Sequence, residues 1–260
     1  MMRSKLFAGV VALAVLSVCS LPWVAAAEPD FALGARVTLD AFRATIDGRL
    51  QGTVTATRLL AATEEARSGD WARMRDPLGV LATSLPEQAA VWYAGADGSL
   101  FTVAKGATGE TLRERAYFPS LLAGRDVVGS LVISTSTGKR AVIVASPVVV
   151  DGKVAGAVGV SLDAAMLAAS IDGAIRFPAD IVFYTLDDRG QTALHRAGQL
   201  IFAFPSDVGS ATLKDAVQTM LSQPEGVVHY QYEGSDRTAL FTRSALTGWT
   251  YVLGKAHPAR

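Results

Sequence analysis

The chain has 260 residues, with 24 basic and 24 acidic side chains and therefore a formal net charge of zero at neutral pH. This length allows one large domain or two small ones with a substantial hydrophobic core. The neutral charge balance argues against nucleic acid as a partner, because such binding relies on a strongly basic surface.

Residues 1–27 have the pattern of a secretory signal peptide, and they raise the mean hydropathy to +0.30. Arg3 and Lys5 form the charged start, and the apolar run Leu6–Cys19 is too short to span a bilayer comfortably. Ala25–Ala27 supplies a cleavage site of small residues. The sequence therefore predicts a periplasmic or secreted protein.

Cys19 is the only cysteine, and it allows an alternative in which the chain is a lipoprotein. Val18 is bulky where a lipoprotein signal has a small residue, so we favour cleavage before Glu28. A mature chain without cysteine has no disulfide, no thiol catalysis and no cysteine-bound metal. We also expect no second membrane anchor and no attached signalling domain before Arg260.

Residues 28–75 are predicted to form a long N-terminal helix. Apolar residues recur there at steps of three and four, at Leu39, Phe42, Ile46, Leu50, Val54 and Leu59/Leu60. The stripe is consistent with a helix packed on the rest of the domain and with a helix that dimerises. Ser68–Pro77 interrupts the pattern, and Pro77 is expected to start a new segment.

Residues 76–172 are predicted to form a first module. Ala89–Val103 reads as two strands joined at Asp97-Gly98, which is typical hairpin turn chemistry. A short helical segment follows, and then Lys139–Leu162 gives a long hairpin turning at Asp151-Gly152. This order is that of a PAS-like antiparallel sheet with a small pocket between the sheet and its crossing helices.

Residues 173–260 repeat that order in a second module. Ile181 begins a strand–turn–strand unit, and Ser210–Ser222 has helical periodicity. Three strands follow, at Val227–Tyr232, Arg237–Arg243 and Trp249–Leu253. The predicted fold class is therefore α+β, with a long N-terminal helix and two PAS-like antiparallel-sheet modules.

The order of motifs resembles the double Cache family of extracellular sensing domains. The motifs are Tyr93, Asp97-Gly98, Arg-x-Tyr-Phe at 115–118, Ser146-Pro147 and the Asp-Gly-x-Val-x-Gly-x-Val-Gly run at 151–159. The resemblance covers roughly residues 30–256. It implies a ligand pocket in the first, membrane-distal-type module and a second, membrane-proximal-type module that is usually a spacer without ligand.

Catalysis has little support in the sequence, and we expect no enzyme and no cofactor. His195, His229 and His257 lie on different elements, without the spacing of a metal site. No P-loop, nucleophile elbow or dinucleotide-binding glycine motif is present. A secreted hydrolase using the hydroxyls at Ser134–Thr137 with one of two histidines is a weaker alternative.

A binding site has more support, and it centres on Arg115. A guanidinium beside the rings of Tyr117 and Phe118 is a recurring way to hold a carboxylate. Trp92 and Tyr93 alternate in direction on their strand, so one of the two can face the same pocket. The alternative places Arg115 in solvent, paired with a glutamate at 110 or 114.

The resemblance refines the expected ligand. Cache modules that bind amino acids or amines have an Arg-x-aromatic-aromatic motif and an aspartate on the last strand for the amino group. Here Ser161 stands where that acid is expected, and Asp163 comes two residues later. An ammonium left without a buried counter-charge is costly, so a small carboxylate is favoured over an amino acid or amine. Ser134, Ser146 and Ser161 are the candidate hydroxyl donors.

The sequence therefore predicts a non-enzymatic periplasmic or secreted sensor or solute-binding domain that binds a small organic acid. Such a domain would pass its state to a membrane receptor or transporter, and it could form a homodimer. The alternative is a structural or interaction module with a degenerate pocket that dimerises through the N-terminal helix.

Overall fold

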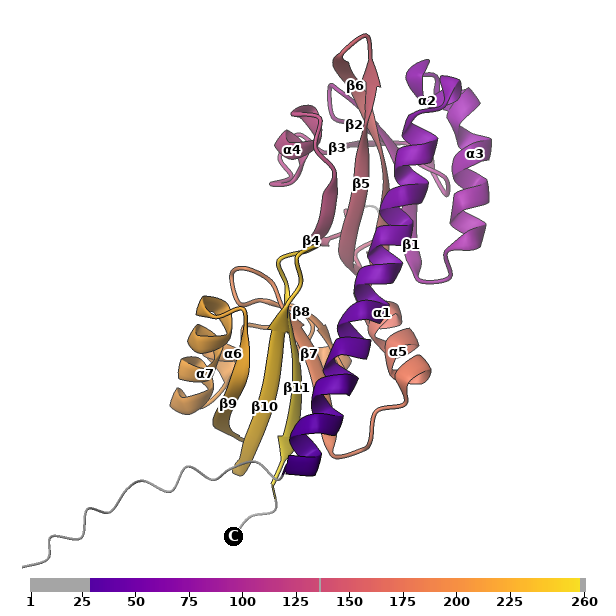
Figure 1. Cartoon of the computed structure of the whole chain (residues 1–260). Coiled ribbons are helices and arrows are strands. Elements are labelled where there is room, and N and C mark those ends of the chain that lie inside the picture. The colour runs from indigo at the N-terminus through magenta and orange to yellow at the C-terminus, as the bar shows by residue number, and fades with distance from the viewer. Residues whose placement is uncertain (1–28, 136, 258–260) are drawn as a thin grey trace, which may run out of the picture.

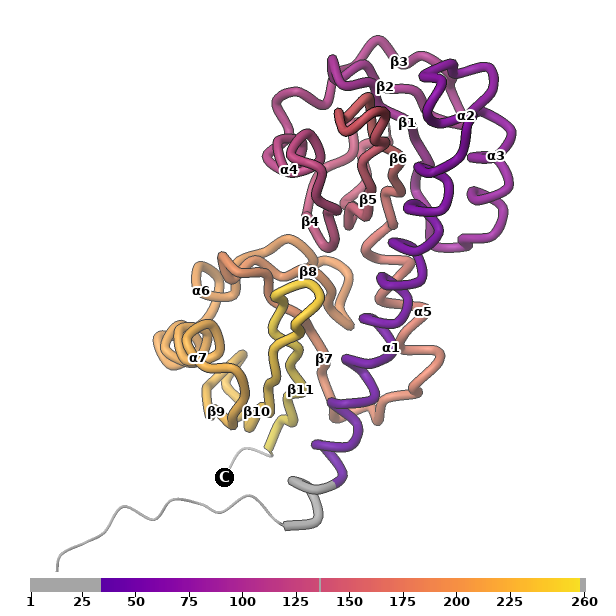
Figure 2. Tube along the Cα trace, turned by 45° about the horizontal axis from the view of Figure 1, so that its top comes forward, coloured from indigo at the N-terminus to yellow at the C-terminus, as the bar shows by residue number. Residues whose placement is uncertain are grey.

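The structure is a computed structural model that describes residues 29–135 and 137–257. One long helix, α1 (Pro29–Ala61), runs beside two antiparallel sheets that lie one beyond the other along it (Figures 1 and 2). This α+β architecture confirms the predicted fold class. The predicted signal peptide, including Cys19, lies outside the described residues.

The first module is a six-stranded sheet in the order β3-β2-β1-β6-β5-β4. Helices α1, α2 (Glu64–Arg67) and α3 (Trp71–Ser84) cover one face, and the short α4 (Phe118–Leu122) lies on the other. The strands are β1 (Gln88–Gly95), β2 (Ser99–Thr102), β3 (Gly106–Thr111), β4 (Val127–Ile133), β5 (Arg140–Val150) and β6 (Lys153–Asp163).

The second module is a five-stranded sheet in the order β8-β7-β11-β10-β9, and α5 (Ala164–Ile175) leads into it. Helix α1 packs on one face, and the opposite face carries η1 (Gly198–Leu200), α6 (Pro205–Val208) and α7 (Ala211–Ser222). The strands are β7 (Ile181–Leu186), β8 (Thr192–His195), β9 (Glu225–Tyr232), β10 (Ser235–Arg243) and β11 (Thr250–Ala256).

The apolar stripe of α1 is buried against both modules, as the packing interpretation predicted. Leu39, Phe42, Ile46, Leu50 and Val54 are each at most 1% exposed. The expected continuation at Leu59 is wrong, because that side chain is 68% exposed and Thr57 and Ala61 take the buried positions. An α-helix has 3.6 residues per turn, so positions three or four residues apart share a face. Leu59 is five residues after Val54 and therefore points away from the buried face.

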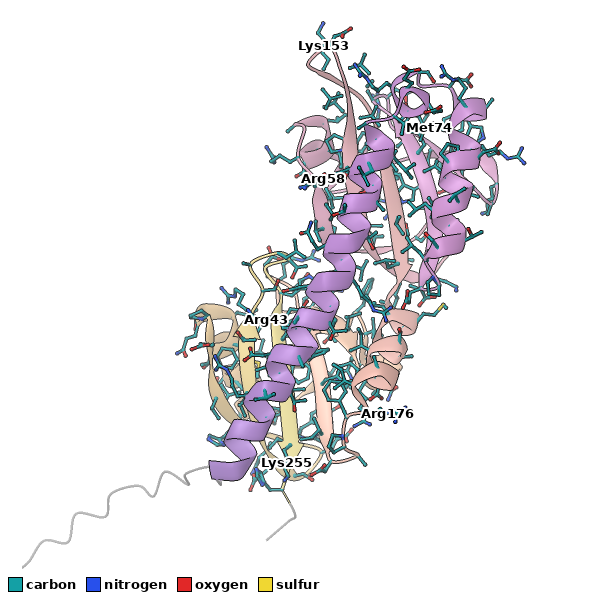
Figure 3. All side chains as sticks on the ribbon, turned by 45° about the vertical axis from the view of Figure 1, so that its right-hand side comes forward. Arg43, Arg58, Met74, Lys153, Arg176 and Lys255 are labelled. Carbon is teal, nitrogen blue, oxygen red and sulfur yellow. The ribbon has the colours of Figure 1, made fainter. Side chains whose placement is uncertain are left out.

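Polar contacts also tie α1 to each module. Asp47 accepts hydrogen bonds from Ser244 (2.9 and 3.0 Å) and from the Tyr251 hydroxyl (2.8 Å) in the second module. On the first module, Arg58 of α1 pairs with Asp126 at 2.5 Å. Arg43 and Arg58 mark the parts of α1 beside the second and the first module respectively (Figure 3).

Pro77 does not start a new segment but lies inside α3. Asp70 caps this helix by accepting a hydrogen bond from the Ala72 amide at 2.9 Å. Proline removes one backbone donor inside the helix. Burial of Met74, Leu78 and Leu81 on one face outweighs that loss, so tertiary packing overrides the local signal.

Candidate functional site

Side chains of the first module converge on a small cavity on the sheet face opposite α1. It is lined by Trp92, Arg115, Tyr117, Ser134 and Ser161, five of the side chains that the sequence pointed to, together with Leu100, Thr102, Leu112, Val132, Thr135 and Ile143. No carboxylate is among these lining residues. The cavity volume is about 20 Å³. Roughly 10–15 Å³ of such space holds one water molecule, so a carboxylate enters only if a side chain moves.

Trp92 is the largest side chain that lines this cavity. Strand alternation turns Trp92 toward the cavity and Tyr93 toward α1 and α3, as expected for neighbours on one strand. The indole lies against Gly159, where an added Cβ would come within 2.1 Å of Trp92 Cζ2. Its Nε1 donates a hydrogen bond to Ser161 Oγ at 3.2 Å.

Arg115 and Tyr117 line the cavity from the segment between β3 and α4. Nη2 of Arg115 donates a hydrogen bond to the Ile133 carbonyl at 3.1 Å. Across the described ranges Arg115 makes no ion pair with Glu110 or Glu114, the partners of the solvated alternative. Burial raises the pKa of Tyr117 to about 12, against an opposing effect of the Arg115 charge, so the phenol is a hydrogen-bond donor at neutral pH.

Three of the proposed residues lie elsewhere. Tyr93 packs under the helices, and Phe118 is buried beside α4 without lining the cavity. Ser146 faces α1, where its hydroxyl lies 2.9 Å from that of Thr57. Ser146 therefore cannot donate into the cavity, because strand alternation turns it to the opposite face from Ile143.

Asp163, which follows the expected position of a ligand-binding acid, has a structural role instead. It caps α5 by accepting hydrogen bonds from the amides of Ala165 (3.0 Å) and Met166 (3.1 Å), and it pairs with Lys139 at 2.9 Å. The cap explains why α5 begins at Ala164.

A second cavity, of about 430 Å³, lies in the second module, where the resemblance implied a spacer. Tyr184, Tyr230 and Arg237 line it from the sheet. Sequence reasoning missed Arg237, although a signal existed. Arg237 shares its strand face with the buried Ala239 and Phe241, and a charged residue on an apolar face is unusual.

Neither a metal centre nor a membrane span is found where the structure can be described. Residues 29–135 and 137–257 contain no cluster of three or more histidine, cysteine or acidic residues able to hold a metal ion. No helix in the same ranges has the length and apolarity to cross a membrane. His195 and His229 lie in the second module, whereas the hydroxyl-bearing turn at Ser134 lies in the first.

Comparisons with known proteins identify the fold. No family model and no curated protein sequence matches the chain. Among solved structures, the ligand-binding domain of the Pseudomonas aeruginosa PAO1 amino acid chemoreceptor PctB in complex with L-Arg has 15% identity and a TM-score of 0.69, over 88% of this chain and 95% of that one. The V. cholerae histidine kinase DctB sensor domain has 15% identity and a TM-score of 0.66, over 88% and 98%.

An extracellular ligand-binding receptor from Desulfohalobium retbaense DSM5692 has 18% identity and a TM-score of 0.67, over 89% of this chain. This chain spans only 41% of that receptor's length. Together with one long helix beside two antiparallel sheets, these likenesses show that the chain has the double Cache fold of extracellular ligand-binding sensor domains.

Proposed function

We propose that this chain is a non-enzymatic periplasmic or secreted sensor domain that binds a small carboxylate in its first module. The supporting observation is that Trp92, Arg115, Tyr117, Ser134 and Ser161, from separate segments, line one cavity that contains no acid. A cation with hydroxyl donors and no counter-charge for an ammonium suits an anion.

Binding in this site requires Trp92 to move away from Gly159. That movement breaks the hydrogen bond to Ser161 and frees the Ser161 hydroxyl for the ligand. The carboxylate then pairs with Arg115, and Tyr117 donates its phenol hydrogen. The solved likenesses include a domain in complex with L-Arg and a histidine kinase sensor domain, which supports a ligand-sensing role. In this proposal the chain passes ligand occupancy to a membrane receptor or transporter.

The test is a thermal-shift screen of residues 28–260, the predicted mature chain, with small carboxylates, amino acids and amines. A ligand at about 100 times its dissociation constant adds roughly 2.7 kcal/mol to the folded state, which raises the midpoint by about 5–10 °C. We expect a carboxylate to produce this shift and Arg115→Gln to abolish it. Arg125→Gln is the matched control, because Arg125 is an exposed arginine of the same module outside the cavity.

A second candidate function is an interaction module whose first pocket is filled by its own side chains. The 20 Å³ volume of that cavity favours it. In that case no compound in the panel shifts the midpoint through Arg115. The chain would instead self-associate through its N-terminal helix α1. Analytical ultracentrifugation over a range of protein concentrations detects such association.

A further inference from the structure

The cavity of the second module lies between the sheet and the segment that leads into α7. Tyr184 of β7, Tyr230 of β9 and Arg237 of β10 form its floor. Leu200, Ala203 and Leu213 contribute to the apolar wall. A volume of about 430 Å³ lies within the range of small-molecule sites, which are mostly apolar with a few placed polar groups.

Arg237 is the cation of this cavity, and the protein leaves it without an anion. Its Nε is buried without a hydrogen-bond partner, and within the described ranges its guanidinium makes no ion pair. Its guanidinium lies over the ring of Tyr232, whose centroid is 5.1 Å from Cζ. Arg237 is half-buried, and a polar atom buried without a partner is costly, so an anion bound in the cavity would supply the missing partner.

Arg196, which follows β8, differs from Arg237 in having partners for its guanidinium. It lines a neighbouring open groove, but four of its five guanidinium donors are engaged there. Nε pairs with Asp172 at 3.2 Å, and the Nη atoms donate to the carbonyls of Phe177, Pro178 and Ile181 at 2.6–3.1 Å. Arg196 is therefore a structural cation, whereas Arg237 has donors available for a ligand.

Tyr184, Tyr230 and His195, which line the cavity together with Arg237, are neutral hydrogen-bond donors. The hydroxyls of Tyr184 and Tyr230 lie 3.4 Å apart, and burial raises both pKa values, so both stay protonated. Burial, followed by the Arg237 charge, lowers the pKa of His195 to about 4. Nδ1 of this neutral imidazole accepts a hydrogen bond from the Ala197 amide at 2.7 Å, which places the ring proton on Nε2.

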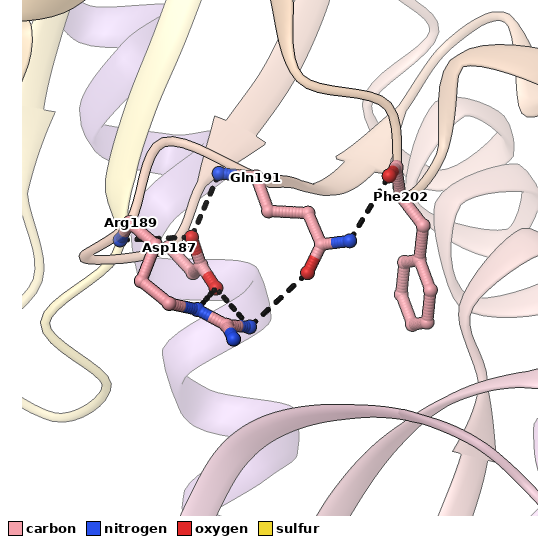
Figure 4. A network of polar contacts seen from close by, with 4 residues as sticks. All are labelled: Asp187, Arg189, Gln191 and Phe202. Atoms are coloured by element: carbon pink, nitrogen blue, oxygen red, sulfur yellow. Dashed lines mark hydrogen bonds and ion pairs between the residues drawn. The ribbon is translucent and has the colours of Figure 1, made fainter.

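A hydrogen-bond network ties Phe202, the chain neighbour of the cavity-lining Ala203, to the turn between β7 and β8 (Figure 4). Asp187 accepts from the Gln191 amide at 2.8 Å and pairs with Arg189 at 3.0 Å, and the Gln191 side chain donates to the Phe202 carbonyl at 3.0 Å. Phe202 has φ of 69°, a conformation that costs free energy in a bulky residue. The segment next to Ala203 is therefore preorganised, which lowers the entropic cost of binding.

We infer that the second module holds a binding site for a small organic monocarboxylate with an apolar, ring-sized body, in which Arg237 pairs with the carboxylate. Glu233 is the single acidic residue among those lining the cavity, and it is exposed. An ammonium group on the ligand therefore has no buried counter-charge. This inference does not depend on the site proposed at Arg115.

The experiment is calorimetric titration of the predicted mature chain with four matched probes. The reference probe is 3-phenylpropionate, and each of the other three changes one of its features. Phenylalanine carries an added ammonium group, 3-phenylpropionamide lacks the negative charge, and propionate lacks the ring. We expect 3-phenylpropionate to bind and the other three to bind at least about tenfold more weakly, a factor that corresponds to about 1.4 kcal/mol, because each of them lacks the charged pair or the buried ring or adds an unpaired ammonium. Arg237→Gln should weaken 3-phenylpropionate by a similar factor, and Arg115→Gln should not.

The outcomes separate the two sites. Loss of 3-phenylpropionate binding in Arg115→Gln but not in Arg237→Gln overturns this inference and leaves the first site standing. Absence of binding by 3-phenylpropionate, or stronger binding by phenylalanine, also overturns it. Should Arg237→Gln fold poorly, NMR of the wild-type protein decides: the ring signals of His195, assigned with His195→Gln, should move during titration while those of His257 stay in place.

Discussion

At the scale of single residues, Gly159 determines how Trp92 lies in the first module. A methyl group there would lie 2.1 Å from the indole Cζ2, so Gly159→Ala must displace the ring and break its hydrogen bond to Ser161. We expect a loss of about 1–3 kcal/mol in the free energy of unfolding, the usual cost of overpacking, measured by urea denaturation.

Gly173→Ala is the matched control for this substitution. Gly173 lies inside α5, and an added Cβ there meets nothing within 4 Å. Replacing glycine by alanine in a helix interior should raise the free energy of unfolding by about 0.5–1 kcal/mol. Equal effects of the two substitutions would contradict the packing of Trp92 described above.

At the scale of elements, Asp163 determines where α5 begins. Burial alone would raise its pKa, but the hydrogen bonds and charge of Lys139, with the amides of Met166 and Ala165, outweigh burial and lower it. A lowered folded-state pKa means that the stabilisation is present above the unfolded value and is lost as pH falls through the folded value. Asp163→Ala should cost about 1 kcal/mol at pH 7 and clearly less at pH 3, measured by denaturant unfolding.

Asp163→Asn tests the same cap without its charge. Asparagine accepts the same amide hydrogen bonds, so it should retain most of the stability at pH 7 and remove most of the pH dependence. If Asp163→Ala lowers the free energy of unfolding equally at both pH values, the charge of the Asp163 cap is not the source of the stabilisation.

At the scale of the whole molecule, α1 joins the two modules into one unit. Its 33 residues extend about 50 Å, and one apolar cluster runs from Leu81 and Val160 of the first module through α1 to Leu253 of the second. Gly129 of the first module also packs closely against Trp249 of the second. A Cβ atom added at Gly129 would lie 3.2 Å from the Trp249 ring. Shared burial of this kind favours cooperative unfolding.

Calorimetry should therefore show a single unfolding transition. Asp47→Ala leaves the buried Tyr251 hydroxyl without its 2.8 Å partner, which costs about 1–3 kcal/mol, and the entire transition should move to lower temperature. Two separated transitions, with only one of them shifted by Asp47→Ala, would contradict a single cooperative unit.

Local features of the sequence predicted the elements and their order. Apolar spacing marked the stripe of α1 from Leu39 to Val54, and strand alternation separated Trp92 from Tyr93. Asp151-Gly152 marked a turn in which both residues have positive φ, at 49° and 75°. These features depend on a few neighbouring residues, so a sequence without a structure is sufficient to predict them.

The sites depended on tertiary structure. Arg115, Tyr117 and Ser161 were expected together, but only packing shows that Trp92 leaves about 20 Å³ between them. The fold places Thr57 of α1 against the Ser146 hydroxyl, and only the fold leaves Arg237 without an anion beside about 430 Å³ of open space. The sequence by itself determined the elements and the residue types available. The volume of a cavity and the partners of a buried charge depend on side chains distant in the chain, so the tertiary structure alone decided them.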